Sequence, residues 1–302
     1  MHWSRGVAVV VLALAGAPLG AQTIDDGQMM AKHDLCAGFV YAHDRWDHYW
    51  EGTLKRENGN IGAVTTQNVT WMGTYGVASR VNVIAMMPYV WTKASQGVLH
   101  GMRGFQDVTL AVKYGLLDKR LTENSSLGAF VVGAVGAPVS DYTPDFLPLA
   151  IGSASRHSSG RLTVDLRRQG WFFRGSGAYT WRGNVTLDRP FYFTDGQAYF
   201  TNEVAVPNVV DYAATAGYAK RRLRVSGSFW QQRMQGGGDI RRQDMPFVSN
   251  RMNVSRASGL VMVSLPRVER LAVRLDAARV LSGRNVGQST TVGAGLLYTF
   301  HF

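Results

Sequence analysis

Cysteine, long apolar runs and acidic residues are all scarce in this chain of 302 residues. The single cysteine, Cys36, cannot form a disulfide within the chain. No stretch approaches the ~20 apolar residues that a membrane-spanning helix needs, and the closest, residues 129–139, is rich in Gly and Ala. The sequence also has no phosphate loop, dinucleotide fingerprint or Cys/His cluster. We therefore predict no cofactor, no metal site and no nucleotide-driven activity.

The first 21 residues have the organisation of a secretory signal peptide. Arg5 precedes an apolar run at residues 7–14, and small residues lead to Gly20 and Ala21. The run is too short to cross ~30 Å of hydrocarbon, which disfavours a membrane anchor. We expect a signal peptide at residues 1–21, cleaved before Gln22, and a single exported domain at residues 22–302.

The scarcity of acidic residues gives the chain a formal charge of +11. Such a balance often indicates nucleic-acid binding, but an exported chain rarely meets nucleic acid. Anionic lipopolysaccharide, or a lumen that attracts anions, fits an exported protein better. We therefore expect outer-membrane lipid and lipopolysaccharide as partners, and no nucleic acid.

Residues 290–302 alternate in character from one residue to the next. One parity holds Val292, Ala294, Leu296, Tyr298, Phe300 and Phe302, and the other is mostly small or polar. A β-strand places these two sets on opposite faces. Bacterial outer-membrane β-barrels commonly end on such a strand, and the barrel-insertion machinery reads its terminal Phe. We expect Phe302 to have this role.

The same alternation recurs along the chain and predicts about twelve strands, with ten to fourteen as the acceptable range. They cover residues 35–46, 62–72, 79–92, 105–117, 127–139, 161–168, 171–185, 204–219, 223–234, 252–265, 270–281 and 290–302. Pro88 falls inside the third of them, where it requires an edge, a bulge or a strand end.

The lengths of the connections support a membrane barrel. Long connections, at residues 47–60, 93–104, 140–158, 187–203 and 236–249, alternate with short ones, at residues 73–76, 118–125, 169–170, 220–222 and 266–269. An outer-membrane barrel with short periplasmic turns and long outer loops has this pattern. A soluble β-sandwich would also alternate, but it would not need aromatic residues at strand ends. The predicted fold is all-β, a membrane-spanning antiparallel up-and-down β-barrel in the bacterial outer membrane.

In such a barrel the polar parity faces the lumen. It carries Asp107, Lys113, Asp165, Arg167, Arg174, Arg182, Asp211, Arg224, Arg256, Arg274 and Asp276. The residues that we select as lumen-lining candidates are Asp107, Lys113, Arg174, Arg182 and Arg224. Their cationic bias predicts a conduit for anions or for amphiphiles with an acidic head. Alternatively, the charges pair between strands and fill the barrel as a rigid plug, because twelve strands enclose an intermediate space.

Two other functions stay open. His157, Ser158 and Ser159 resemble the His–Ser order of outer-membrane phospholipase A, which would make the protein a lipid hydrolase. The spacing is one residue short, and no base or oxyanion donor is evident, so we expect no catalytic residues. A structural or adhesive barrel would act through residues 140–158, 187–203 and 236–249. The group His43, Asp44, Asp47 and His48 lacks a metal-ligand spacing and is expected to be solvated.

Four segments carry a family resemblance: Met87-Pro88-Tyr89, residues 104–114, residues 133–139 and residues 148–153. The region from residue 86 to residue 166 and the last strand resemble a family of bacterial outer-membrane proteins, the transporters of the MetA pathway of phenol degradation. Two positions depart from the family's pattern: Gln106 stands where Gly is more usual, and Asp141, the Asp of the family's Gly-Asp-Tyr, follows a Ser. The resemblance implies an outer-membrane barrel that passively passes small hydrophobic or aromatic compounds, with no established site residues.

Overall fold

The computed structural model describes residues 23–242, 244–265, 268 and 270–302. The predicted signal peptide at residues 1–21 lies outside the described residues. Across the described part, no helix is long and apolar enough to cross a membrane. All the regular elements there are β-strands.

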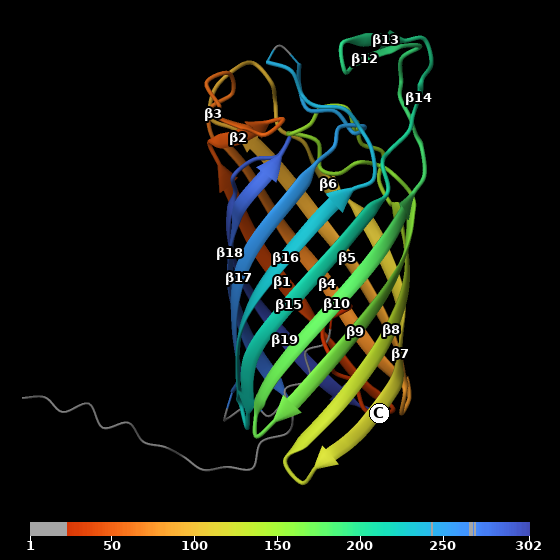
Figure 1. Ribbon diagram of the computed structural model, residues 1–302, viewed down its shortest axis with the longest axis vertical. Coiled ribbons are helices and arrows are strands. Elements are labelled where there is room, and N and C mark those ends of the chain that lie inside the picture. The colour runs from red at the N-terminus through yellow and green to blue at the C-terminus, as the bar shows by residue number, and fades with distance from the viewer. Residues whose placement is uncertain (1–22, 243, 266–267, 269) are drawn as a thin grey trace, which may run out of the picture.

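Twelve long strands form one closed antiparallel barrel, as predicted (Figure 1). Each wall strand pairs with the next, and the last pairs with the first, for example through Phe39 opposite Leu296. Closure leaves no strand edge facing lipid, where unpaired backbone groups would be costly. The wall strands are β1 (Asp34–Trp46), β4 (Val64–Ala78), β5 (Val81–Ala94), β7 (Asp107–Thr122), β8 (Ser125–Pro138), β9 (His157–Arg168), β10 (Trp171–Arg182), β15 (Val209–Lys220), β16 (Leu223–Met234), β17 (Asn253–Ser264), β18 (Leu271–Arg284) and β19 (Thr290–His301).

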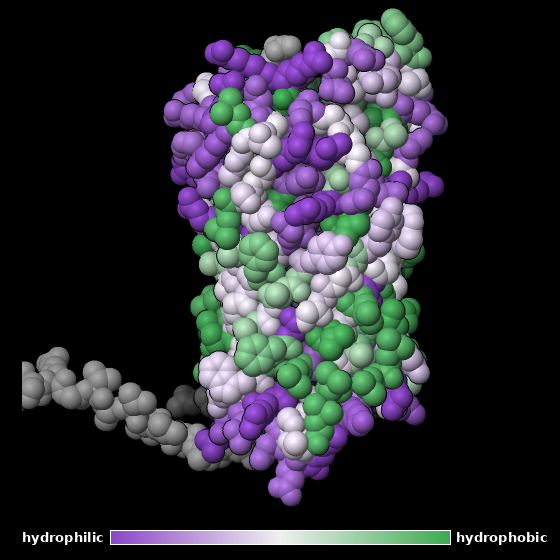
Figure 2. Space-filling view, viewed as in Figure 1, coloured by the Kyte–Doolittle hydropathy of each residue, from purple (hydrophilic) through white to green (hydrophobic). Residues whose placement is uncertain are grey.

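The apolar parity of the wall strands faces outward, as predicted. Phe39 and Leu296, for example, are 58% and 57% exposed, whereas Cys36 and Leu297 on the inward parity are buried. Figure 2 shows hydrophobic residues gathered over the lower half of the wall in this view, with hydrophilic residues at both ends. An exterior of this kind requires lipid around it. Other exposed apolar residues on the wall are Val83, Leu110, Val112, Leu162, Val164, Phe173, Phe229, Leu275 and Val292.

The two ends of the barrel differ, also as predicted. The long connections lie at one end, and the C-terminus and the short turns lie at the other (Figure 1). Two stretches predicted as plain loops contain short hairpins. The hairpins pair β2 (His48–Glu51) with β3 (Leu54–Glu57), β11 (Val185–Thr186) with β14 (Glu203–Val204), and β12 (Tyr192–Thr194) with β13 (Gln197–Tyr199).

Pro88 lies opposite an interruption in the neighbouring strand. The short β6 (Arg103–Phe105) and β7 both pair with β5, and they are separated at Gln106. The Gln106 amide donates to the Pro88 carbonyl at 3.0 Å. Proline cannot donate a backbone hydrogen bond, and Pro88 lies where the pairing with the neighbouring strand is irregular, as expected from the sequence.

The turn predicted at residues 73–76 is wrong, because β4 continues to Ala78. The glycine there serves a different purpose. A Cβ on Gly76 would lie 1.9 Å from the carbonyl oxygen of Ala31, so this glycine lets a backbone segment approach the inner wall. The turn predicted at residues 118–125 is also too long, because β7 ends at Thr122 and β8 begins at Ser125.

Asn285 holds the long connections together over the outer mouth. Its buried side chain accepts hydrogen bonds from the amides of Gly52 at 2.8 Å and Ile240 at 3.1 Å. It donates to Asp239 at 2.8 Å and to the Arg251 carbonyl at 2.9 Å. Asparagine suits this position because the backbone φ is 56°, which few side chains tolerate. One residue thus links three connections of the barrel.

Candidate functional site

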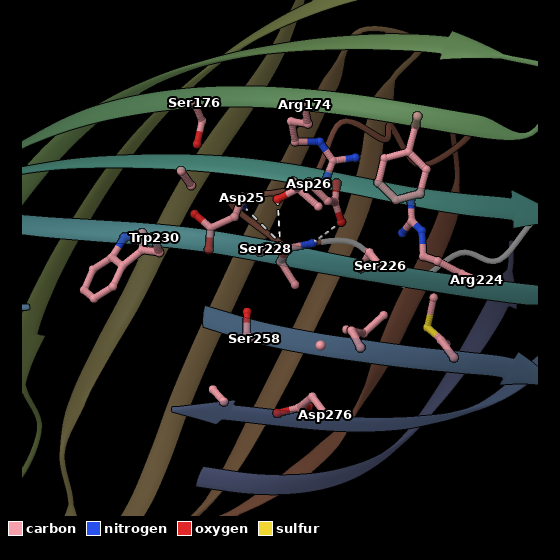
Figure 3. A pocket seen from close by; sticks show the side chains of 18 of the residues that line it. Asp25, Asp26, Arg174, Ser176, Arg224, Ser226, Ser228, Trp230, Ser258 and Asp276 are labelled. Carbon is pink, nitrogen blue, oxygen red and sulfur yellow. Dashed lines mark hydrogen bonds between the residues drawn. The ribbon is translucent and has the colours of Figure 1, made fainter. Parts of the chain in front are cut away.

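The lumen contains a cavity of about 410 Å³, lined by inward-facing residues of β9, β10 and β15–β18 (Figure 3). Strand alternation brings these side chains together, since every second residue points inward. Much of the lining is small and polar, which leaves room for water and solute. The small polar residues are Ser176, Thr215, Ser226, Ser228 and Ser258.

The charged lining of this cavity is predominantly cationic. Five arginines line it, one from each of five wall strands, and three aspartates oppose them. Only one of the aspartates, Asp276, belongs to the wall, since Asp25 and Asp26 precede β1. The wall therefore presents a concentrated positive field to the lumen. The five arginines are Arg161, Arg174, Arg224, Arg256 and Arg274.

Some of these arginines are paired with wall carboxylates. Arg174 donates to Asp165 at 2.9 Å, and Arg274 donates to Asp276 at 2.8 Å. Arg161 lies 2.8 Å from a carboxylate oxygen of Asp211. Such pairs were expected if the charges filled the barrel as a plug, and they account for part of the lining.

Two other arginines carry the remaining charge. Within the described residues, Arg224 and Arg256 form no direct ion pair with a wall carboxylate. Arg224 donates to the side-chain oxygen of Gln28 at 2.8 Å, and Arg256 donates to the hydroxyl of Thr291 at 3.2 Å. Arg224 also interacts electrostatically with Asp26 and Asp165, and Thr291, the partner of Arg256, donates to Asp44 at 2.7 Å. The cavity lining thus holds more arginines than aspartates, with extensive internal pairing.

Phe172 lies between two of the arginines. The guanidinium carbons of Arg174 and Arg224 are each 5.3 Å from the centre of its ring, a cation–π distance. Both side chains are more than nine-tenths buried, and each has a buried nitrogen without a hydrogen-bond partner among the described residues. Unsatisfied cationic donors of this kind are costly unless an acceptor reaches them.

Residues 23–33, here called the N-terminal segment, enter the lumen instead of lying outside the barrel. The Asp26 carboxylate lies 2.7 Å from the ammonium of Lys113, which is fully buried. The same ammonium donates to the carbonyls of Asp26 at 2.6 Å and Thr23 at 3.3 Å. Arg161 lies 3.1 Å from Asp25.

Apolar contacts hold the segment at both of its ends. Ile24 packs against the buried cluster that includes Ile84 and Val132, on β5 and β8. Met30 is buried in a cluster with Met262 and Leu297, on β17 and β19. The segment therefore contacts the wall both at β5 and β8 and at β17 and β19, and it occupies part of the lumen.

The five lumen candidates all occupy inward-facing positions, but they do not form one site. Arg174 and Arg224 line the cavity, and Lys113 binds the N-terminal segment beside it. Asp107 lies near the outer end, where it accepts a hydrogen bond from the Tyr142 hydroxyl at 2.7 Å. Arg182 ends β10 at the same level and interacts electrostatically with Asp107. These two belong to the outer mouth.

The sequence reasoning missed Asp25 and Asp26. The only signal was an acidic pair without a basic neighbour, at the start of a strongly basic exported chain. It also left Arg161 unnamed, although this residue shares the inward parity of Thr163 and Asp165. The parity rule alone was sufficient to find Arg161. Nothing local to the sequence could place the acidic pair inside the barrel.

The hydrolase alternative finds little support in the geometry. His157 and Ser159 share the inward parity of β9, but the described hydrogen bonds include none between them. The His157 Nδ1 lies 3.3 Å from the carbonyl oxygen of Ser155 instead. Of the group His43, Asp44, Asp47 and His48, only the last two form the expected solvated pair, at 2.7 Å, where Asp47 precedes β2. His43 and Asp44 lie on β1 instead of in a loop, and Asp44 accepts a hydrogen bond from Thr291 at 2.7 Å.

Comparison with known proteins supports the fold. No family model and no curated protein sequence matches the chain. An outer membrane channel from Pseudomonas putida F1 matches in structure with a TM-score of 0.70 and 14% identity, covering 91% of this chain and 98% of that one. The NanC porin (TM-score 0.45, 8% identity, 87% and 99% covered) and a mutant of the TodX monoaromatic hydrocarbon channel (0.43, 10%, 90% and 91%) are more distant.

The first of these matches is close enough in structure to show a shared fold. This chain is a barrel of the outer-membrane type, and the outer-membrane location expected from its sequence agrees with that fold. The resemblance to the phenol-degradation family stays a resemblance, because no family model matches.

Proposed function

We propose that this protein is a passive outer-membrane channel for small anionic solutes, including aromatic anions. The observation that carries the proposal is the lining of the lumen, where five arginines outnumber three aspartates, although Asp165, Asp211 and Asp276 each pair with one of the arginines. A cationic, water-accessible path raises the local concentration of anions and repels cations. The fold shared with an outer membrane channel supports a transport role of this kind.

The lining favours anions over the neutral hydrophobic compounds implied by the family resemblance. A hydrocarbon that passes Arg256, Arg274 and the lining serines would remove little of its apolar surface from water, because these side chains are polar. Aromatic anions combine both expectations, because a negative group can meet an arginine while the ring approaches Phe172 or Trp230.

A flux measurement in liposomes tests this function. We expect purified protein to release benzenesulfonate about tenfold faster than benzyltrimethylammonium, an aromatic cation of similar size. Arg256→Glu should reduce the benzenesulfonate flux, because it reverses a lumen charge whose direct partner is the neutral Thr291. Arg279→Glu is the matched control, since Arg279 is exposed on the outward parity of β18. Equal flux of the two solutes would contradict the proposal.

We infer that outer-membrane lipid and lipopolysaccharide surround the barrel, because the outward parity is apolar and the chain is basic. A role of Phe302 in insertion also stays a prediction. A hydrolase would require His157 and Ser159 for lipid turnover, and a structural barrel would conduct nothing. The flux experiment separates the channel from both alternatives.

A further inference from the structure

We propose that Lys113 and Arg161 form a binding site for a small dicarboxylate in the lumen, and that the N-terminal segment occupies this site as an internal ligand. The proposal rests on the proposed channel function and names the solute that would displace the segment. It starts from the way in which two adjacent carboxylates are held. Asp26 lies 2.7 Å from Lys113 on β7, and Asp25 lies 3.1 Å from Arg161 on β9.

Lys113 lies on β7 and Arg161 lies on β9, with β8 between them. The two carboxylates of the segment, Asp26 and Asp25, therefore contact different cations. A dicarboxylate with a short linker reproduces this arrangement, whereas a monocarboxylate contacts only one of the two cations. Arg161 keeps its wall partner Asp211, at 2.8 Å, in either case. Further donors are available at the same place. Arg174 and Arg224 each have a buried nitrogen without a partner among the described residues, and both line the cavity with Asp25 and Asp26 (Figure 3).

Lys113 is the strongest reason to expect an anion here. Its side chain is fully buried and faces the lumen, with Asp26 as its ion-pair partner. A buried ammonium without a counter-charge is strongly unfavourable. If the N-terminal segment left the lumen, another anion would have to take the place of Asp26. The wall is therefore built to hold a negative group at this position.

The segment itself is bound in a way that allows exchange. It has no regular secondary structure and adds no strand to the wall. In the described part of the chain, its backbone-to-backbone bonds with the barrel lie at its last three residues: His33 donates to Gly76 at 2.8 Å and accepts from Phe302 at 3.1 Å, and Ala31 accepts from Asp34 at 3.1 Å. Further into the lumen, ion pairs, side-chain hydrogen bonds and apolar contacts hold it. A competing dianion would replace Asp25 and Asp26 as the partners of Arg161 and Lys113.

The test uses the mature protein and succinate as the probe. We expect calorimetric titration at pH 7 to detect succinate binding, at least tenfold tighter than binding of propionate at equal ionic strength. In the variant with Asp25→Asn and Asp26→Asn, succinate affinity should rise about tenfold, because the internal ligand no longer competes. The control variant, Asp118→Asn with Glu123→Gln, removes two exposed charges at the turn end and should bind as the wild type does.

Conductance in planar bilayers gives the second readout. Succinate should increase the open probability of the wild type in a saturable manner, and the Asp25/Asp26 variant should be open without it. Absence of succinate binding in the wild type, or equal affinities in wild type and variant, would overturn the proposed site even if the channel conducts anions. Succinate binding without any current would retain the site and overturn the channel. The wild-type titration needs no variant to fold.

Discussion

Lys113 is buried inside the lumen although it carries a charge, and its environment explains how the barrel tolerates it. Its ammonium has an ion pair with Asp26, two backbone carbonyl acceptors and the Phe130 ring 5.5 Å away. The sequence predicted that Lys113 faces inward, because parity is a local property. It could not predict the partner, since Asp26 lies 87 residues earlier and reaches Lys113 only through the closed barrel.

Replacement of this lysine tests that account at the residue scale. We expect Lys113→Met to lower the free energy of unfolding by about 3 kcal/mol, because Asp26 would be left buried without its cation. The measurement is urea unfolding from lipid vesicles, followed by tryptophan fluorescence. Adding Asp26→Asn should recover part of the loss, as coupled residues do. Lys119→Met, at an exposed position, should change the stability by no more than about 0.5 kcal/mol. A loss that Asp26→Asn does not reduce would argue against the ion pair.

Among the elements, the wall strands were the most predictable and the connections the least. Every predicted strand corresponds to a wall strand, because lipid outside and a polar lumen inside enforce strict alternation. Glycine misled the prediction at residues 73–76, where it permits close approach of Ala31 instead of forming a turn. The hairpins within residues 47–60 and 187–203 are stabilised by packing of one connection on another, which no local pattern records.

The connections over the outer mouth should depend on pH through Asp239. Hydrogen bonds from Arg284 and Asn285 hold the pKa of Asp239 below its usual range. A carboxyl with a lowered pKa stabilises the folded contact above the usual Asp value of about 3.9, and the contribution is lost as the pH falls through the lowered value. The contact should therefore be intact at neutral pH and weaken only in strong acid.

Hydrogen exchange, corrected for the intrinsic rate, checks this prediction in the connection between β16 and β17. We expect constant protection between pH 7 and about pH 5, and a decrease below about pH 4. Asp239→Asn should remove most of the pH dependence in this range. Loss of protection already near pH 6 would show that a different group controls these connections.

At the scale of the whole molecule, the basic charge and the barrel architecture have one explanation. The chain has a formal charge of +11, and the barrel places five of its arginines around one cavity. The sequence allowed two readings of these charges, an anion conduit or an internally paired plug. The structure contains elements of both, because Asp165, Asp211 and Asp276 pair with some arginines and the N-terminal segment occupies part of the lumen.

The reversal potential of the mature protein in planar bilayers, under a tenfold gradient of potassium chloride, tests the central claim most directly. A lumen whose lining has more arginines than aspartates should pass chloride roughly tenfold more readily than potassium. The Asp25→Asn and Asp26→Asn variant should conduct more while keeping this preference for chloride. A reversal potential near zero, or one that indicates preference for potassium, would contradict the account.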